Sequence, residues 1–421
     1  MNDAAVTAAA VDGQPGAAGP SPGPASEPAA GKVAARHRHT PAIVAALVVL
    51  FAVVVVGART AAVCDGAIGC PLVAGDRYSD AAEVDIPVTP GNGYDAQFFY
   101  RQVRSPFDFS MERVNGVVFD TEVRYGRIGY PLTAWVLSAG GQPAAVPWAM
   151  FAVGALSLGA VAWVLALGAR DARRSPWWGA LAVALPGVWF AAGRGLADPL
   201  STALIGAGAL ALTRRRHGLA TLAFVAAALT KEQAVLVPAV YGLWRLWELL
   251  VVRRRSTAAG TADAFGRADL PWLVPGAVFA AWQLLLWGVT GAMPAGESGG
   301  SHVVAPLRDL LPAVVDWLTP SGSSQVLWLV EVLVFVALAA LVAVSDRSAG
   351  WERGVAVVGV LFVAVLNDNV FVDPAHFRQL GEVSVVLCLA AFRADPRWWI
   401  PVLGANAVAT LGVLGRLAAA L

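Results

Sequence analysis

The sequence predicts an all-α polytopic membrane protein with about eleven transmembrane helices and a large first extracytoplasmic loop. The chain has 421 residues, of which 57% are hydrophobic and 14% are charged, whereas soluble domains carry about 25% charged residues. Apolar runs recur along most of the chain, and arginines cluster in alternate gaps between them. The net charge of +1 is not typical of nucleic-acid binding, so we expect the lipid bilayer and no nucleic acid as a partner.

Residues 1–40 are predicted to be a disordered cytoplasmic tail. They are rich in Ala, Gly and Pro and lack aromatic residues. Such a segment buries too little apolar area to offset the entropy of ordering it. The next apolar run, 41–58, is longer than the apolar part of a signal peptide and has no convincing cleavage site, so it predicts a retained first span.

The region 41–420 is predicted to be the transmembrane domain. Its candidate spans lie near 41–58, 143–168, 176–192, 198–212, 218–230, 233–251, 270–292, 325–345, 354–370, 380–393 and 398–420. Arginines fill the gaps after 168, 212, 251, 345 and 393, and the positive-inside rule places these gaps and the N-terminus in the cytoplasm. We therefore expect a multi-pass protein of the plasma membrane, whose longest extracytoplasmic loops are 59–142 and 293–324.

The loop 293–324 contains a stretch with helical periodicity. Its apolar residues recur at i, i+3, i+4, i+7, i+8 and i+11: Leu307, Leu310, Leu311, Val314, Val315 and Leu318. This spacing predicts one apolar stripe on a helix. The helix either lies in the membrane interface and covers a lipid-substrate site or simply packs on the helical bundle.

Most carboxylates fall in the outer loops, so we expect the chemistry on the extracytoplasmic side. Asp95 is the strongest candidate, because it lies in an aromatic segment, 94–100, that is unusual for a solvated loop. Partial desolvation there would raise its basicity and suit a general base. Asp95 is also a candidate ligand of a divalent cation, or the N-cap of a helix that starts at Ala96. Its neighbours Tyr94 and Gln97 are candidate substrate contacts, as are Arg124, Glu232 and Asp198.

Two arginines follow in the same loop, Arg124 and Arg127. Guanidinium forks bind phosphate oxygens bidentately, and arginines outside the membrane oppose the positive-inside trend. The sequence leaves two explanations open, which are binding of a lipid phosphate and pairing with Asp120 or Glu122.

Two short outer turns carry further charges. Lys231 and Glu232 form one, and Lys231 is the only lysine beyond the N-terminal tail. A compact ammonium there suits a phosphate, although charges are also ordinary at a tight turn. The other turn holds Arg194 and Asp198, for which mutual pairing or helix capping by Asp198 is the preferred explanation over catalysis.

The segment after the ninth predicted span adds Arg378, a second candidate ligand of a lipid phosphate, and His376, a candidate sugar or metal contact. A lone histidine at an interface is more often structural. Cys64 and Cys70 stand six residues apart in the first outer loop, where an oxidising compartment would favour a disulfide between them.

With these residues in place, the chain resembles the GT-C class of integral-membrane glycosyltransferases over roughly residues 41–395. The resemblance depends on the order of one span, a large outer loop with Gly93-Tyr94-Asp95 and Arg124-Tyr125-Gly126-Arg127, and many spans with short outer turns. The segments around Asp198 and Lys231 are similar to bacterial members that make cell-surface glycopolymers. The resemblance implies a hexosyl- or pentosyltransferase that moves a sugar from a polyprenyl-phosphate carrier to an extracytoplasmic glycan, glycolipid or protein.

The resemblance also implies residue roles. Asp95 would be the acid at the catalytic centre, and Lys231, Arg127 and Arg378 would bind the lipid phosphate. Many members carry two adjacent acids, whereas Ala96 follows Asp95 here, so a divalent cation stays an option and none is assigned. The chain lacks a Gly-rich phosphate loop that opens a helix, which disfavours a nucleotide-driven enzyme.

A transporter or flippase of lipid-linked saccharides is the alternative function. It would place charges in the middle of spans along a pathway, whereas the charges here concentrate in loops. The enzymatic interpretation predicts that these distant polar turns meet in one pocket.

Overall fold

The computed structural model describes residues 39–185, 187–252, 266–294, 304–319, 326–366, 371 and 374–419. Residues 1–38 of the predicted tail, 1–40, lie outside the described part of the chain. Regular structure in the described ranges is helical except for one pair of two-residue strands, so the predicted all-α class is confirmed.

The α-helices differ widely in length. They are α2 (Thr40–Val63), α3 (Ala96–Arg104), α4 (Gly129–Leu137), α5 (Val146–Asp171), α6 (Val188–Gly193), α7 (Asp198–Thr213), α8 (His217–Thr230), α9 (Leu236–Trp247), α11 (Leu270–Thr290), α13 (Leu310–Trp317), α14 (Val326–Val344), α15 (Gly350–Ala364), α17 (Gly381–Ala391) and α18 (Pro396–Ala419).

Tighter or wider helical turns and the two strands complete the described structure. The turns are η1 (Cys70–Leu72), η2 (Glu122–Gly126), η3 (Pro143–Ala145), η4 (Pro176–Ala184), η5 (Glu232–Val235), η6 (Glu248–Val252), η7 (Arg267–Asp269) and η9 (Pro374–Leu380), and the strands are β1 (Ala74–Gly75) and β2 (Val88–Thr89).

Four helical stretches of the described chain are long and apolar enough to cross a membrane. They are Thr40–Val63, Pro143–Asp171, Glu232–Val251 and Arg267–Thr290. His217–Thr230 and Trp328–Val344 are shorter apolar helices. The protein is therefore a multi-pass membrane protein, whereas the predicted count of about eleven spans is not confirmed.

Prolines mark the beginnings of several membrane helices. Pro41, Pro147, Pro199 and Pro271 lie in the first turns of α2, α5, α7 and α11. Proline is tolerated there because the first N–H groups of a helix have no intrahelical acceptor and its fixed φ suits the helix. These helix starts are therefore readable in the sequence.

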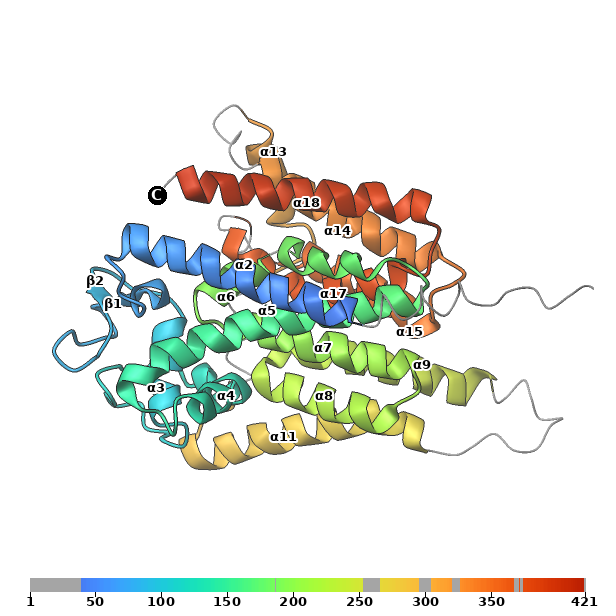
Figure 1. The fold of residues 1–421 in the computed structure, drawn as a ribbon. Coiled ribbons are helices and arrows are strands. Elements are labelled where there is room, and N and C mark those ends of the chain that lie inside the picture. The colour runs from blue at the N-terminus through green and yellow to red at the C-terminus, as the bar shows by residue number, and fades with distance from the viewer. Residues whose placement is uncertain are drawn as a thin grey trace, which may run out of the picture. The chain divides into compact units, whose positions relative to one another are not determined.

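Helix α5 occupies the centre of the described unit and packs against α2, η4, α6 and α7. Helix α7 packs in turn on α8 and α17, and α14 packs on α15 and α18. In Figure 1 the long helices run roughly parallel, with α11 and α18 on opposite sides. Small residues allow close contacts, since a Cβ on Gly179 would lie 2.4 Å from the carbonyl oxygen of Ala162.

The prediction of one continuous span over 176–192 is wrong. Helix η4 ends at Ala184, the chain passes Gly187 at φ +63°, and the short helix α6 follows. The carbonyl of Ala184 accepts hydrogen bonds from the side chains of Asn406 and Thr410 in α18. A broken helix is tolerated in a membrane protein when neighbouring groups satisfy its freed backbone.

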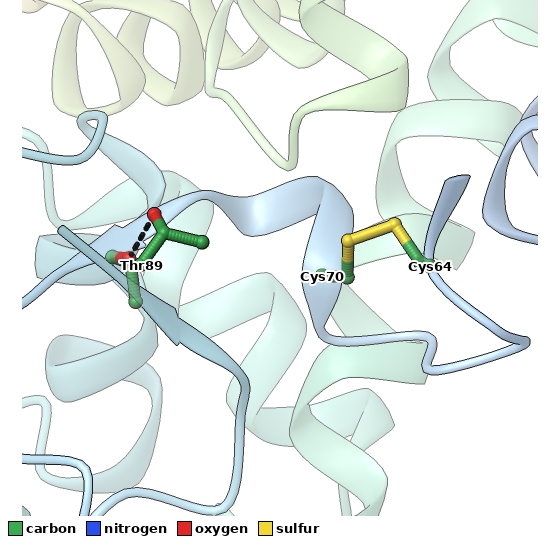
Figure 2. The surroundings of a disulfide bond; sticks show 4 residues. Cys64, Cys70 and Thr89 are labelled. Carbon is green, nitrogen blue, oxygen red and sulfur yellow. Dashed lines mark hydrogen bonds between the residues drawn. A yellow bond between two sulfur atoms is a disulfide. The ribbon is translucent and has the colours of Figure 1, made fainter. Parts of the chain in front are cut away.

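Between α2 and α5 the chain forms a compact region, here called the loop region. Strands β1 and β2 pair in parallel, with Ala74 opposite Val88. The hydroxyl of Thr89 donates a hydrogen bond of 3.1 Å to the carbonyl of Ala74 (Figure 2). Cys64 and Cys70, which the sequence offered for a disulfide, are joined by one (Figure 2). In Figure 1 this region gathers β1, β2, α3 and α4 at one end of the long helices.

Helix α13 lies within the stretch of the loop 293–324 for which the sequence predicted a helix with one apolar stripe. Leu310 and Val314 pack against the core, whereas Leu311 and Val315 are more than half exposed. The helix therefore packs on the bundle and also presents an apolar face outward. Its placement in the membrane interface stays a prediction.

Candidate active site

Asp95 directly precedes α3 and is its N-cap residue, but its side chain makes no capping hydrogen bond. Its carboxylate faces two arginines instead. Oδ1 accepts a hydrogen bond of 2.8 Å from Arg124 Nη1, and Oδ2 accepts one of 3.2 Å from Arg378 Nη2. The helix-capping explanation of Asp95 is thus excluded, and the side chain belongs to a charged cluster.

Aromatic packing fixes the helix that carries Asp95. Phe98 packs on Tyr78 and Phe119, and Phe99 packs on Tyr130, with ring centroids between 5.1 and 5.9 Å apart. The guanidinium of Arg124 lies 4.2 Å from the centroid of the Phe98 ring. Such contacts hold the start of α3 in place.

Gln97 serves this local structure rather than a substrate. Its side chain is buried; the oxygen accepts hydrogen bonds from the Gly75 amide at 3.0 Å and the Ser79 hydroxyl at 2.8 Å, and the amide donates to the Asn92 carbonyl at 2.8 Å. Its polar groups are used inside the loop region, so the structure gives Gln97 a structural role and lends no support to the expected substrate contact. Tyr94 does reach the cluster, because its hydroxyl accepts a hydrogen bond of 2.7 Å from Arg378 Nη1.

Arg124 links Asp95 to Asp120. Its Nε and Nη2 donate to the two oxygens of Asp120 at 2.8 and 2.7 Å, while Nη1 donates to Asp95. The hydroxyl of Thr121 accepts from the Val123 amide at the start of η2, which carries Arg124. The predicted pairing of Arg124 with Asp120 is therefore present, together with the contact to Asp95.

Arg127 forms a bidentate pair with Glu232. Its Nε and Nη2 donate to the two carboxylate oxygens at 2.9 and 2.7 Å. The partners are 105 residues apart, and a close approach of α4 to the end of α8 brings them together, since a Cβ on Gly129 would lie 2.5 Å from Thr230 Oγ1. A parallel fork of this kind is the geometry in which a guanidinium also binds phosphate.

Arg378 in η9 connects Asp95 to Asp198. Its Nε lies 3.4 Å from Asp198 Oδ2, and its Nη2 lies 3.2 Å from Asp95 Oδ2. The break at Gly187 positions its backbone, because a Cβ there would come within 2.2 Å of the Arg378 nitrogen. Only glycine combines this close approach with a left-handed φ at little cost.

Lys231 lies deeper than the arginines, between two carboxylates. Its Nζ is 2.8 Å from Asp198 Oδ1 and 3.0 Å from Glu382 Oε1. All three side chains are at most 7% exposed. Sequence reasoning missed Glu382, although an acid near the start of an apolar run is a signal of function.

Six ion pairs therefore join seven groups of alternating charge in the order Asp120, Arg124, Asp95, Arg378, Asp198, Lys231 and Glu382. The Arg127–Glu232 pair lies beside this chain. The groups from Asp120 to Asp95, with Arg127 and Glu232, are 18–26% exposed, whereas those from Arg378 to Glu382 are 4–9% exposed. The site thus has an accessible layer over a buried one.

Neighbouring charges decide the protonation of the site. Burial raises the pKa of Asp95, but Arg124, Arg378 and Arg127 outweigh it and hold the pKa of this carboxyl well below its usual range. The expectation of raised basicity is therefore wrong, because the three arginines together outweigh desolvation, which is the largest single effect on this pKa. Burial lowers the pKa of Lys231, and Asp198 and Glu382 raise it above the ordinary value. Both groups are charged at neutral pH.

The structure does not support the expected roles of His376 and of a divalent cation at Asp95. The side chain of His376 lies outside them. Within the described ranges, no group of three or more His, Cys, Asp or Glu residues is arranged to hold a metal ion. The carboxylate of Asp95 is engaged by two arginines, so these residues do not form a fitted cation site.

The site and the helical fold define a multi-pass membrane protein that holds a partly buried cluster of paired charges. Residues 129–367 match the model of Glycosyltransferase family 87, and the chain belongs to this family. The match spans Asp198, Lys231 and Glu232, and Asp95 lies before it. This membership bears out the predicted resemblance to membrane glycosyltransferases rather than to a transporter or flippase.

A solved structure of ArnT from Cupriavidus metallidurans bound to undecaprenyl phosphate is similar to this chain with a TM-score of 0.46 and 17% identity. The similarity covers 85% of this chain and 61% of that one. A comparison with curated proteins gave no match.

Proposed function

We propose that the protein transfers a hexosyl or pentosyl residue from a polyprenyl-phosphate carrier to an extracytoplasmic glycan, glycolipid or protein. The observation that carries the proposal is the position of Asp95, which lies between Arg124 and Arg378 in a cluster built from four distant parts of the chain. A carboxylate beside guanidinium forks suits a reaction in which a sugar leaves a phosphate.

The arginines supply the donor-phosphate site. Arg127 is partly exposed and presents its fork in the accessible layer, where a phosphate competes with Glu232 for the same two N–H groups. Arg378 lies behind Asp95 and faces Tyr94. Lys231 is enclosed by two carboxylates, so it acts from the buried layer as a charge behind Arg378 rather than as a direct ligand.

Helix α7, which begins at Asp198, also lines an apolar groove that suits a lipid donor. A cavity of about 310 Å³ lies between α4, α5 and α7, and its lining is almost entirely apolar. Leu156 and Trp163 line it from α5, and Leu200 lines it two residues after Asp198. This position supports binding of the carrier chain along α5 and α7 while its phosphate reaches the charged cluster.

Transfer is proposed to occur in one step. The acceptor oxygen attacks the anomeric carbon while the bond from that carbon to the phosphate oxygen breaks, and polyprenyl phosphate leaves with the electron pair. Asp95 accepts a hydrogen bond from the acceptor hydroxyl and orients it. The proton of that hydroxyl passes to the departing phosphate, because the low pKa of Asp95 makes its carboxylate the weaker base. The arginines stabilise the charge that develops on the leaving phosphate. The cytoplasmic N-terminus and the extracytoplasmic site remain part of the proposal and follow from the arginine distribution.

The test uses the purified full-length protein in liposomes. Radiolabelled polyprenyl-phosphate hexoses and pentoses are supplied with a lipid and glycan extract as acceptor, beside matched nucleotide sugars. We expect label to leave the lipid carrier, polyprenyl phosphate to accumulate and nucleotide sugars to give no product. Transfer from nucleotide sugars alone, or movement of intact donor across the bilayer without transfer, would refute the proposal.

A further inference from the structure

We propose that Glu382 is a positioning residue, which holds Lys231 so that Asp198 can share its carboxylate with Arg378 and thereby aim Arg378 at Asp95. This inference rests on the proposed function. Glu382 touches neither Asp95 nor the accessible layer through any ion pair of the described residues.

The geometry of the buried layer supports this role. Asp198 divides its two oxygens, with Oδ1 2.8 Å from Lys231 Nζ and Oδ2 3.4 Å from Arg378 Nε. Glu382 gives Lys231 a second carboxylate at 3.0 Å. If Glu382 were neutral, the ammonium would have Asp198 as its single counter-charge, and it would draw that carboxylate away from the weaker contact with Arg378.

The chain connects the two ends of this arrangement directly. Arg378 and Glu382 are four residues apart, in η9 and in the first turn of α17. They flank the Lys231–Asp198 pair, whose members come from the end of α8 and the start of α7. The segment 378–382 therefore contacts the Lys231–Asp198 pair at both ends, through Glu382 and Arg378, and Arg378 also contacts Asp95.

A simpler structural role does not account for Glu382. No side-chain capping hydrogen bond is made at the start of α17, and Lys231 is the one side chain of the described residues that pairs with the Glu382 carboxylate. Glu352 provides the contrast. It is also buried in the first turn of a helix and paired with an arginine, Arg393, but its carboxylate accepts a hydrogen bond of 2.8 Å from the Ala349 amide and so caps α15.

The test is a double-mutant cycle in the transfer assay, with Glu382→Gln and Arg378→Lys alone and combined. We expect Glu382→Gln to lower kcat about 10- to 100-fold with a nearly unchanged donor KM, because misplaced groups slow chemistry without removing binding. In the Arg378→Lys background the same change should lower kcat less than about twofold, because residues that act as one unit are not additive.

Glu352→Gln is the matched control, and it should lower the melting temperature while kcat per folded molecule stays at the wild-type value. Equal effects of Glu382→Gln in both backgrounds would show a merely structural role and overturn the inference. If Glu382→Gln gives no folded protein, the cycle is run with Glu382→Asp, which keeps the charge but withdraws it from Lys231, and the same two outcomes decide. Absence of transfer by the wild type would instead refute the proposed function.

Discussion

Replacing Asp95 with asparagine should abolish most transfer at a moderate cost in stability. The carboxylate makes ion pairs at 2.8 Å with Arg124 and 3.2 Å with Arg378, and its own side chain is 26% exposed. An exposed pair contributes about 0–1 kcal/mol, and breaking a fully buried pair costs about 3–5 kcal/mol. Because Asp95 lies between these limits, we expect a loss of about 2 kcal/mol in the free energy of unfolding.

The effect on transfer should be larger. Asparagine keeps the shape of the side chain but lacks the negative charge that orients the acceptor hydroxyl and holds Arg124 and Arg378 in place, so kcat should fall about 10²-fold or more. The assay is transfer of label from the polyprenyl-phosphate donor, normalised to folded protein by size-exclusion chromatography. Donor binding should weaken little, because Arg127 is unchanged.

Asp120→Asn is the matched control. Asp120 is 25% exposed and holds the same Arg124 through two hydrogen bonds, so its loss should destabilise the protein by a similar amount while kcat falls less than about tenfold. Near-wild-type transfer by Asp95→Asn would refute the assignment. Equal inactivity of both variants would attribute the effect to the orientation of Arg124.

Three further predictions test the surroundings of Asp95. Arg127→Lys removes the bidentate fork but keeps the charge, so the donor KM should rise about tenfold, or 1.4 kcal/mol, with little change in kcat, and an unchanged KM would contradict the phosphate site. The low pKa of Asp95 adds stability above its unfolded value of about 3.9, and this stability is lost only as the pH falls below that value, toward and through the folded pKa. Melting temperatures and initial rates should therefore show no titration of Asp95 between about pH 5 and 8. A titration in this pH range that disappears in the Asp95→Asn variant would contradict the ion pairs of Asp95 with the arginines. Gly187→Ala places a Cβ 2.2 Å from the backbone of η9 at φ +63°, so it should cost at least about 1–2 kcal/mol and lower kcat. Gly288→Ala in α11, where an added Cβ meets nothing within 4 Å, is its control, and equal kcat values for both variants would contradict the role of the helix break.

The sequence predicted those parts of the fold that depend on local composition. The runs 41–58, 143–168 and 270–292 correspond to α2, α5 and α11, whose apolar sequences leave little choice but helices in a bilayer. The division of 176–192 into η4 and α6 was missed. The glycine at position 187 was its signal, because a glycine inside an apolar run often marks a turn or a close backbone approach.

The candidate residues of the site were chosen one by one, whereas their pairing, apart from that of Arg124 with Asp120, was not predicted. Asp95, Arg127, Lys231 and Arg378 were chosen from chemistry, whereas the partners of Arg127 and Arg378 lie 105 and 283 residues away. Nothing local in a sequence fixes such contacts. The predicted direction of the Asp95 pKa shift was wrong for the same reason. Desolvation can be inferred from the aromatic residues next to Asp95, but the charges that outweigh it come from other segments of the chain.

Pairing explains how one site can be stable both with and without a donor. An unpaired guanidinium near apolar helices would lose hydration without compensation, so each cation of the site has a carboxylate partner in this structure. In the proposed function, a donor phosphate binds by replacing one of those carboxylates. The Arg127–Glu232 pair is the one suited to exchange, because it stands outside the alternating chain, is about one-fifth exposed and already has the bidentate geometry that a phosphate needs. Glu232 would thus hold the phosphate site in shape until the donor arrives, while the chain from Asp120 to Glu382 keeps Asp95 in position throughout the reaction.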